Sequence, residues 1–210
     1  MTTSYFWLTK DYRASAGSWQ LDEPVDATGE AFDRAFQLTS GMPVSVEGPL
    51  KCPLRRPGTP LDFSLTKFSD IPVVPERIAR LIGQWAPGDV QAIPVEVEGQ
   101  SESHCILVAT RTVACIDEAK SKKVEYWKPK EGRPERADRR YTRVEGLRID
   151  PSKVGAAQLF RPSGWTVALI VSERLHAELL DAKVSGIHFE CVTRPPEHDV
   201  LEQDRSDPWS

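Results

Sequence analysis

The stretch that decides the fold runs from Pro60 to Gly99 and has the sequence PLDFSLTKFSDIPVVPERIARLIGQWAPGDVQAIPVEVEG. Within it, Pro75 can occupy the first position of a helix, where its missing N–H costs nothing. A turn over residues 87–89 would end this helix, and alternating apolar residues predict a strand over 93–97. Because Pro94 cannot donate a backbone hydrogen bond, we expect that strand to lie at a sheet edge or to be bulged. The helix is indicated by apolar residues at helical spacing: Ile78, Leu81, Ile82 and Trp85.

The chain beyond this stretch carries further strand patterns. Cys105–Ala109 is continuously apolar, which is typical of a strand in the middle of a sheet, and residues 110–116 are expected to continue it. A short strand is expected at 146–149, followed by Asp150 and Pro151 as the cap and first residue of a helical turn. Residues 167–171 predict a second central strand.

The C-terminal part of the fold is predicted to close with a helix and a strand. Ser172 is expected to cap the helix, and Gly186 to end it. The final strand is expected over residues 187–191. Four side chains of the helix are expected to share its buried face: Leu175, His176, Leu179 and Leu180.

The N-terminal third is less regular. Residues 5–8 suit a strand, 31–38 fit either a helical turn or a strand, and the proline-rich stretch 48–60 is expected to be a loop. Strands and helices do not alternate regularly, so the predicted fold class is α+β, with a mainly antiparallel or mixed sheet and a few packing helices. We expect one globular domain over residues 1–192, or two subdomains divided near 100–146, and a disordered acidic tail over 193–210.

Composition places the chain among ordinary soluble globular proteins. Of its 210 residues, 40% are hydrophobic and 28% are charged. It holds no apolar run of the roughly 18 residues needed to cross a bilayer, and its first residues lack the pattern of a secretory signal. We therefore expect a cytoplasmic protein without a membrane partner. Its cysteines are widely spaced, and we expect them to be free and buried: Cys52, Cys105, Cys115 and Cys191.

No pattern in the sequence predicts catalysis, a cofactor or a metal. The four histidines never stand four residues apart or as a His-x-His pair, so a metal site would need ligands from distant segments. No Gly-x-Ser-x-Gly elbow is present, and most carboxylates stand beside Pro or Gly or at strand ends, where aspartate closes turns. The sequence therefore predicts no catalytic residue, no cofactor, no metal ligand and no enzyme activity.

Charge is spread unevenly along the chain, and two segments are candidate contact surfaces for a partner. The net charge is −4. An acidic set in the first third could face a basic protein: Asp22, Glu23, Asp26, Glu30 and Asp33. The segment 120–143 is basic and has aromatic residues interspersed, and it supplies three further candidates: Trp127, Arg139 and Arg140. Because this composition also suits single-stranded nucleic acid, a nucleic-acid-binding module or a small enzyme using this segment is the alternative function.

Several short motifs, taken in order, resemble one known family. They include residues 61–63 (LDF), 70–74 (DIPVV), 86–91 (APGDVQ), 146–150 (GLRID) and 159–161 (LFR). In this combination the chain resembles the bacterial polymorphic-toxin immunity family numbered eleven, over roughly Tyr5 to Val192.

The resemblance implies a function that the residues alone do not. Members of such a family are cytoplasmic antidotes that bind a cognate secreted toxin, encoded nearby, and block it by occlusion. The resemblance implies no enzyme activity and assigns no toxin-contacting residues. It leaves the oligomeric state open.

Overall fold

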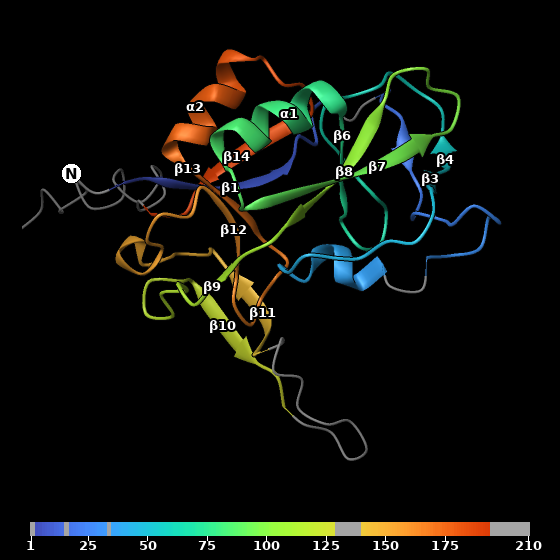
Figure 1. Cartoon of the computed structure of the whole chain (residues 1–210). Helices are drawn as coiled ribbons and strands as arrows, with labels where there is room; N and C mark the ends of the chain where they lie inside the picture. Colours follow the sequence, from blue (N-terminus) through green and yellow to red (C-terminus); the bar gives the residue numbers. More distant parts are fainter. Residues whose placement is uncertain (1–2, 15–16, 33–34, 129–139, 194–210) are drawn as a thin grey trace, which may run out of the picture.

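The computed structural model describes residues 3–14, 17–32, 35–128 and 140–193 of the chain. These residues form an α+β fold, as the sequence predicted, with two helices and two five-stranded sheets (Figure 1). Two smaller two-stranded sheets accompany them. The helices lie on one side of the molecule, and a hairpin extends from the opposite side.

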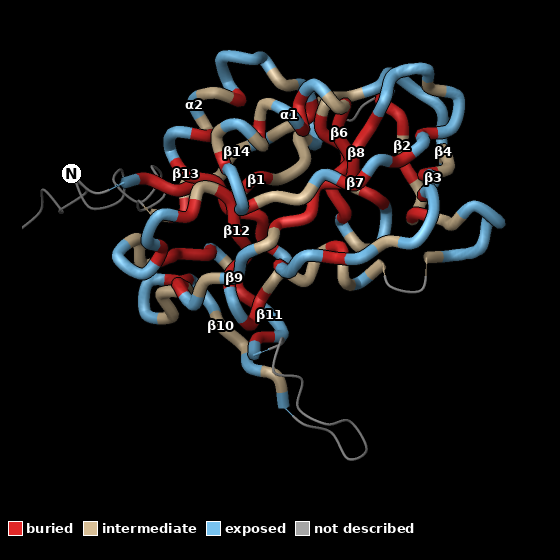
Figure 2. Tube along the Cα trace, in the orientation of Figure 1, coloured by how far each residue is buried: buried red, intermediate tan, exposed pale blue. Residues whose placement is uncertain are grey.

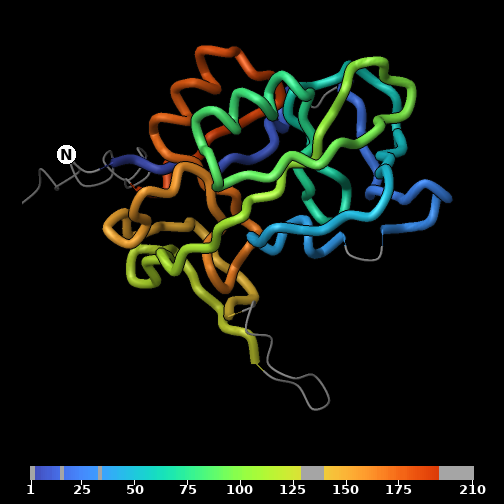
Figure 3. Tube along the Cα trace, viewed as in Figure 1, coloured from blue at the N-terminus to red at the C-terminus, as the bar shows by residue number. Residues whose placement is uncertain are grey.

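The first sheet joins the two ends of the described chain. Its strands, in spatial order, are β14 (Ile187–Cys191), β1 (Tyr5–Lys10), β13 (Leu169–Ser172), β12 (Leu159–Pro162) and β9 (Thr112–Val113). All neighbours pair antiparallel except β9, which runs parallel to β12. Figure 3 shows the blue N-terminal strand beside the red C-terminal one. The predicted strands at 5–8 and 187–191 are thus confirmed, and the one predicted over 167–171 is confirmed from Leu169 onward.

The second sheet is built around the continuously apolar strand that the sequence placed at its centre. The spatial order is β3 (Leu50–Cys52), β7 (Val90–Val97), β8 (His104–Ala109), β6 (Pro72–Pro75) and β5 (Ser64–Leu65). All six residues of β8 are buried, because the strand has a neighbour on each edge and packing on both faces. The β3–β7 pair is parallel, so this sheet is also mixed.

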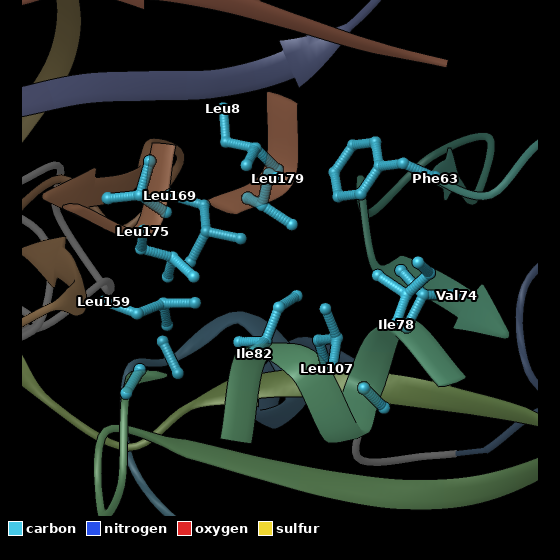
Figure 4. Close-up of a cluster of buried hydrophobic side chains, with 14 of the residues drawn as sticks. Leu8, Phe63, Val74, Ile78, Ile82, Leu107, Leu159, Leu169, Leu175 and Leu179 are labelled. Carbon is cyan, nitrogen blue, oxygen red and sulfur yellow. The ribbon is translucent and has the colours of Figure 1, made fainter. Parts of the chain in front are cut away.

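The apolar stripes of both helices pack into one core with residues of both sheets. Helix α1 (Glu76–Trp85) follows Pro75, which is its N-cap and not its first residue, and buries Ile78 and Ile82. Figure 4 shows these side chains opposite residues of the first sheet and of α2 (Glu173–Asp181). Burying such an aliphatic side chain contributes about 1.5–3 kcal/mol. This shared core holds the two sheets together.

The Ser172 cap of α2 is confirmed, but the helix ends at Asp181, before the predicted Gly186, and one residue of its predicted buried face is exposed. The Ser172 hydroxyl accepts a hydrogen bond from the Leu175 backbone nitrogen at 3.2 Å. Leu175 and Leu179 are buried, whereas Leu180 is 53% exposed. The face is narrower than predicted because α2 has neighbours on one side only, as the exposed outer surface in Figure 2 shows.

Two strand predictions and one loop prediction were wrong. Residues 110–116 do not continue β8, because β9 within this range belongs to the first sheet. The chain turns away after β8, where the Thr110 backbone nitrogen donates to the Asp89 carbonyl and its hydroxyl to the Gly88 carbonyl. The predicted loop 48–60 contains β3 and also β4 (Leu54–Arg56), which pairs with β2 (Gln20–Leu21). Residues 146–149 are not a strand, because Gly146 has a positive φ of 52° and ends β11 (Tyr141–Glu145).

The strand that contains Pro94 is neither at the sheet edge nor bulged, contrary to the expectation from the sequence. Its strand, β7, lies between β3 and β8, and the pairing with β8 runs through Pro94 without a shift in register. The β3 pairing covers only Val95–Val97. Pro94 is therefore tolerated in an interior strand because it lies just beyond the end of that second ladder.

The remaining elements frame the hairpin side of the molecule. The hairpin is β10 (Lys123–Tyr126) paired with β11. For residues 31–38, where a helical turn or a strand was expected, the structure has a helical turn, the 3-10 helix η1 (Ala35–Thr39). Asp150 caps the 3-10 helix η2 (Pro151–Lys153) as predicted. The predicted acidic tail lies outside the described residues, apart from Thr193.

Candidate functional site

Two oppositely charged side chains are buried where the two sheets meet. Asp89, at the start of β7, is 3% exposed. Its Oδ1 atom lies 2.8 Å from Nε of Arg111, and its Oδ2 atom accepts from the backbone nitrogens of Gln158 at 2.7 Å and Leu159 at 3.4 Å. Both oxygens therefore have partners, and together they tie β7 to the entry of β12.

Arg161, on β12, is the second buried charge and is only half satisfied. It is 2% exposed. Its Nη1 atom donates to the carbonyl oxygens of Thr166 at 2.5 Å and Val167 at 3.3 Å. Its Nε and Nη2 atoms are closed to solvent and have no hydrogen-bond partner among the described residues. Burial lowers the pKa of Arg161 to about 10, with the Asp70 carboxylate acting in the opposite direction, so the side chain stays charged at neutral pH.

A pocket of about 520 Å³ lies over Arg161. It is enclosed by η1, the turn at 68–70, the base of the hairpin and the turn at 164–167. Its rim carries large apolar side chains in contact with solvent: Phe36 is 52% exposed, Phe68 70% and Val167 54%. The indole nitrogen of Trp127, which also lines the pocket, is buried with no partner in the described part of the chain. We call this site the Arg161 pocket.

One wall of the Arg161 pocket is held by a carboxylate of the acidic N-terminal set. Glu23 Oε1 accepts from the backbone nitrogens of Phe68 at 2.9 Å and Ser69 at 3.1 Å, which fixes the turn that carries the exposed ring. Asp70 follows with a positive φ of 49°, a conformation that Asp tolerates better than most residues. Burial, and then the Glu23 carboxylate, raise the pKa of Asp70, while Arg161 and Lys10 oppose the rise.

The opposite wall is the base of the hairpin, docked on Gly164. The Gly164 carbonyl accepts from the backbone nitrogens of Arg140 at 2.9 Å and Tyr141 at 3.1 Å. Gly164 has a φ of 80°, and a Cβ atom there would lie 2.7 Å from the Cβ of Arg140. Glycine is therefore required twice, for the turn and for the contact. Beside it, the backbone nitrogen of Trp127 donates to the Arg140 carbonyl at 2.9 Å, which holds Trp127 at the pocket that its side chain lines.

A compact polar cluster fastens the two hairpin strands to the preceding loop. Glu118 accepts from the Tyr141 hydroxyl at 2.6 Å and from that of Tyr126, and it pairs with Arg140 at 3.1 Å. Burial and the Glu118 hydrogen bond raise the pKa of Tyr141 to about 12. Hydrogen bonds from the two tyrosines, together with the charge of Arg140, lower the pKa of Glu118.

The structure separates the predicted contact residues. Glu23 and Trp127 are brought together at the Arg161 pocket, although 104 positions apart in the chain. Asp22 and Asp26 close turns: Asp22 accepts from the Glu23 nitrogen at 3.0 Å, and Asp26 from those of Thr28 at 2.8 Å and Glu30 at 3.1 Å. These bonds, led by that from the Thr28 hydroxyl, lower the pKa of Asp26. Asp33 and Arg139 lie outside the described residues.

Several cations of the basic segment form ion pairs with carboxylates of the same chain. In its described part, Lys120 pairs with Asp117, Lys123 with Glu125, Arg140 with Glu118, and Arg143 with Glu145. These contacts do not favour the alternative of a nucleic-acid platform, because each paired cation is partly neutralised.

His176 and the four cysteines occupy structural positions. His176 stacks on Phe6 with ring centroids 3.9 Å apart and meets Phe189 edge-on. Three of the free cysteines are buried and Cys191 is half-buried, which corrects the expectation for that residue. Burial raises the pKa of Cys52 and of Cys115 to about 12. Within the described ranges, no three His, Cys, Asp or Glu side chains gather as metal ligands. Nor does that part of the chain contain a helix long and apolar enough to span a membrane.

Sequence reasoning missed the residues that define the pocket. Arg161, Asp70, Phe36 and Phe68 were not among the predicted contact residues. The available signal was the arginine in the apolar stretch LFRP, since an arginine inside a buried strand needs a reason. The rim residues gave no comparable signal, because single apolar residues on a surface are ordinary.

A rigid scaffold with an aromatic-rimmed pocket over an incompletely paired charge is typical of a protein that binds a partner. Comparison with known families gives the particular group. The model of the immunity protein family (Imm11) matches residues 15–194, and the chain belongs to this family. The resemblance identified from the motifs is thus confirmed. A search of curated proteins found no match.

Proposed function

We propose that this immunity protein binds a cognate toxin domain and blocks it by occlusion, without catalysis of its own. Membership of the immunity family supports a protective role. We further propose that the toxin is secreted, encoded nearby and met in the cytoplasm, as in competition between bacteria.

The observation that carries the proposal is the Arg161 pocket. Exposed aromatic side chains around a desolvated centre have the composition of an interface hot spot. Two exposed rings, Phe36 and Phe68, and the half-buried Trp127 come from different elements and line the same pocket. We therefore propose the face that bears this pocket as the toxin-binding surface, with Glu23 and Arg140 holding its walls.

Co-expression tests the proposed function. The toxin domain from the neighbouring gene is induced in a susceptible bacterium with this protein, or with a Gly164→Val variant that cannot dock the hairpin. The expected result is survival with the native protein, a stable complex on size-exclusion chromatography, and loss of both with the variant. Continued killing by the toxin, with no complex between the purified proteins, would remove the proposal.

A further inference from the structure

The donors left over in the Arg161 pocket indicate what a partner has to bring. Nε and Nη2 of Arg161 and Nε1 of Trp127 are hydrogen-bond donors without an acceptor among the described residues. Buried donors of this kind are costly to leave unpaired. Because all three nitrogens are closed to solvent, a partner group can bind them only if neighbouring side chains of the pocket lining move aside as it enters. The matching group is an acceptor.

The pairing pattern of Arg161 narrows the acceptor to a carboxylate. Nη1 is occupied by the carbonyls of Thr166 and Val167. The atoms that remain, Nε and Nη2, form one edge of the planar guanidinium, and their parallel N–H bonds match the two oxygens of a carboxylate. A single carbonyl oxygen would satisfy only part of this edge.

Asp70 is not the carboxylate that pairs with the Nε–Nη2 edge of Arg161, and its own charge limits how much negative charge a bound group can carry. It faces the guanidinium, but no ion pair joins the two, and its left-handed backbone fixes it in the neighbouring turn. Because Asp70 already places one carboxylate in the lining, a phosphate with two charges would meet more repulsion than a singly charged group. The apolar rim favours a carboxylate carried on an aliphatic stem.

We infer that the Arg161 pocket receives one acidic side chain of the toxin domain, whose carboxylate binds the Nε–Nη2 edge of Arg161 while its stem packs against Phe68 and Val167. Trp127 Nε1 completes the set of donors. This inference rests on the proposed function, and it adds the chemistry of the anchor on the toxin.

The first experiment needs no toxin. The probes are N-acetyl-glutamate methylamide and N-acetyl-glutamine methylamide, which differ only in the charged group. They are titrated into protein with ¹⁵N-labelled tryptophan, and the Trp127 indole signal is assigned by its loss in Trp127→Phe. We expect a saturable shift with the glutamate probe, and binding of the glutamine probe at least about tenfold weaker. Equal responses to both probes, or no saturable response, would overturn the inference.

Matched variants distinguish the contribution of the bidentate Arg161 edge to probe binding from that of its positive charge. Arg161→Lys keeps the charge and loses the bidentate edge, so the glutamate probe should bind about tenfold more weakly. Unchanged affinity would contradict the assigned role of the edge. If this variant does not fold, as shown by loss of dispersion of the other indole signals, Trp127→Phe serves instead. In that protein the Trp165 signal, from the same pocket, should report weaker glutamate binding and a smaller preference over glutamine.

The second experiment uses the complex. Each acidic residue of the toxin domain is changed to its amide, and each variant is measured against native protein and against Arg161→Met. One position should show coupling of at least about tenfold with Arg161, meaning that its loss has little further effect once Arg161 is gone. A complex without any coupled acid would overturn the inference and leave the proposed function standing. The absence of any complex would overturn the proposed function itself, whatever the probes had shown.

Discussion

Asp89 and Arg161 are buried to nearly the same degree, at 3% and 2% exposure, yet their surroundings differ. Every oxygen of Asp89 has a partner within the chain, whereas two nitrogens of Arg161 have none in the described part. A fully paired buried charge is explained by the fold that it holds together. A half-paired one beside an open pocket is better explained by a partner.

Removing the satisfied charge should give the largest effect. Asp89→Ala leaves the nitrogens of Gln158 and Leu159 without their acceptor and releases Arg111 from its pair. We expect the free energy of unfolding to fall by about 3 kcal/mol, at the lower end for broken buried pairs because Arg111 can reach water. Urea denaturation measures it, with Lys51→Ala as the control for an exposed pair. A loss below about 1 kcal/mol would mean that Asp89 is not the link between the sheets.

Removing the incompletely paired charge of Arg161 should affect toxin binding more than stability. Arg161→Met removes a buried cation and two hydrogen bonds to carbonyls, and these terms oppose each other. We expect the free energy of unfolding to change by less than about 1 kcal/mol, and toxin affinity to fall by about 2 kcal/mol, or roughly thirtyfold. Urea denaturation and calorimetry on the complex measure the two quantities. A large loss of stability with unchanged toxin affinity would contradict the comparison with Asp89.

At the base of the hairpin, the Tyr141 hydroxyl donates a hydrogen bond to Glu118, and alkaline pH should weaken this contact. The pKa of this tyrosine is raised to about 12 from 10. A raised pKa stabilises the fold fully below pH 10, and that stability is lost as pH rises through 12. The contribution lost is about 1.5 kcal/mol, less than the full shift would give, because Glu118 is partly exposed to solvent.

Unfolding measured by urea at several pH values tests this effect. Between pH 10 and 12, the free energy of unfolding of Tyr141→Phe should fall less steeply than that of the native protein. Tyr126→Phe, at a residue that is 48% exposed, is the matched control and should change the slope less. Identical slopes for all three proteins would show that the Tyr141 hydroxyl is not protected by the fold.

The smallest effect is expected at the rim of the Arg161 pocket. Phe68→Ala removes an exposed ring, so stability should stay within about 0.5 kcal/mol, while toxin affinity should fall by about 1 kcal/mol. Leu180→Ala is the matched control, because Leu180 is exposed on α2, on the helical side of the molecule. Equal effects of the two variants on affinity would place the toxin-binding surface elsewhere.

The elements that could be predicted are those whose evidence lies within a few neighbouring residues. Helix α1 and the central strand β8 were visible as an apolar stripe and an apolar run. The missed strands β3 and β4 are three residues each, too short to show alternation, and Pro53 between them suggested a loop. The end of β8 was missed because the turn after Ala109 is set by Asp89, twenty positions earlier in the chain.

By itself, the sequence determined the class of fold, its two helices and the Ser172 cap of the second, the central strands and the family. These follow from side-chain spacing and from ordered motifs, which are properties of neighbouring residues. Only the tertiary structure decided that Phe68, Trp127 and Arg161 line one pocket and that Glu23 holds the turn in its wall, because their positions depend on how distant segments pack. It also decided which buried charge is paired, since a charge is satisfied by whatever the fold places within hydrogen-bonding distance.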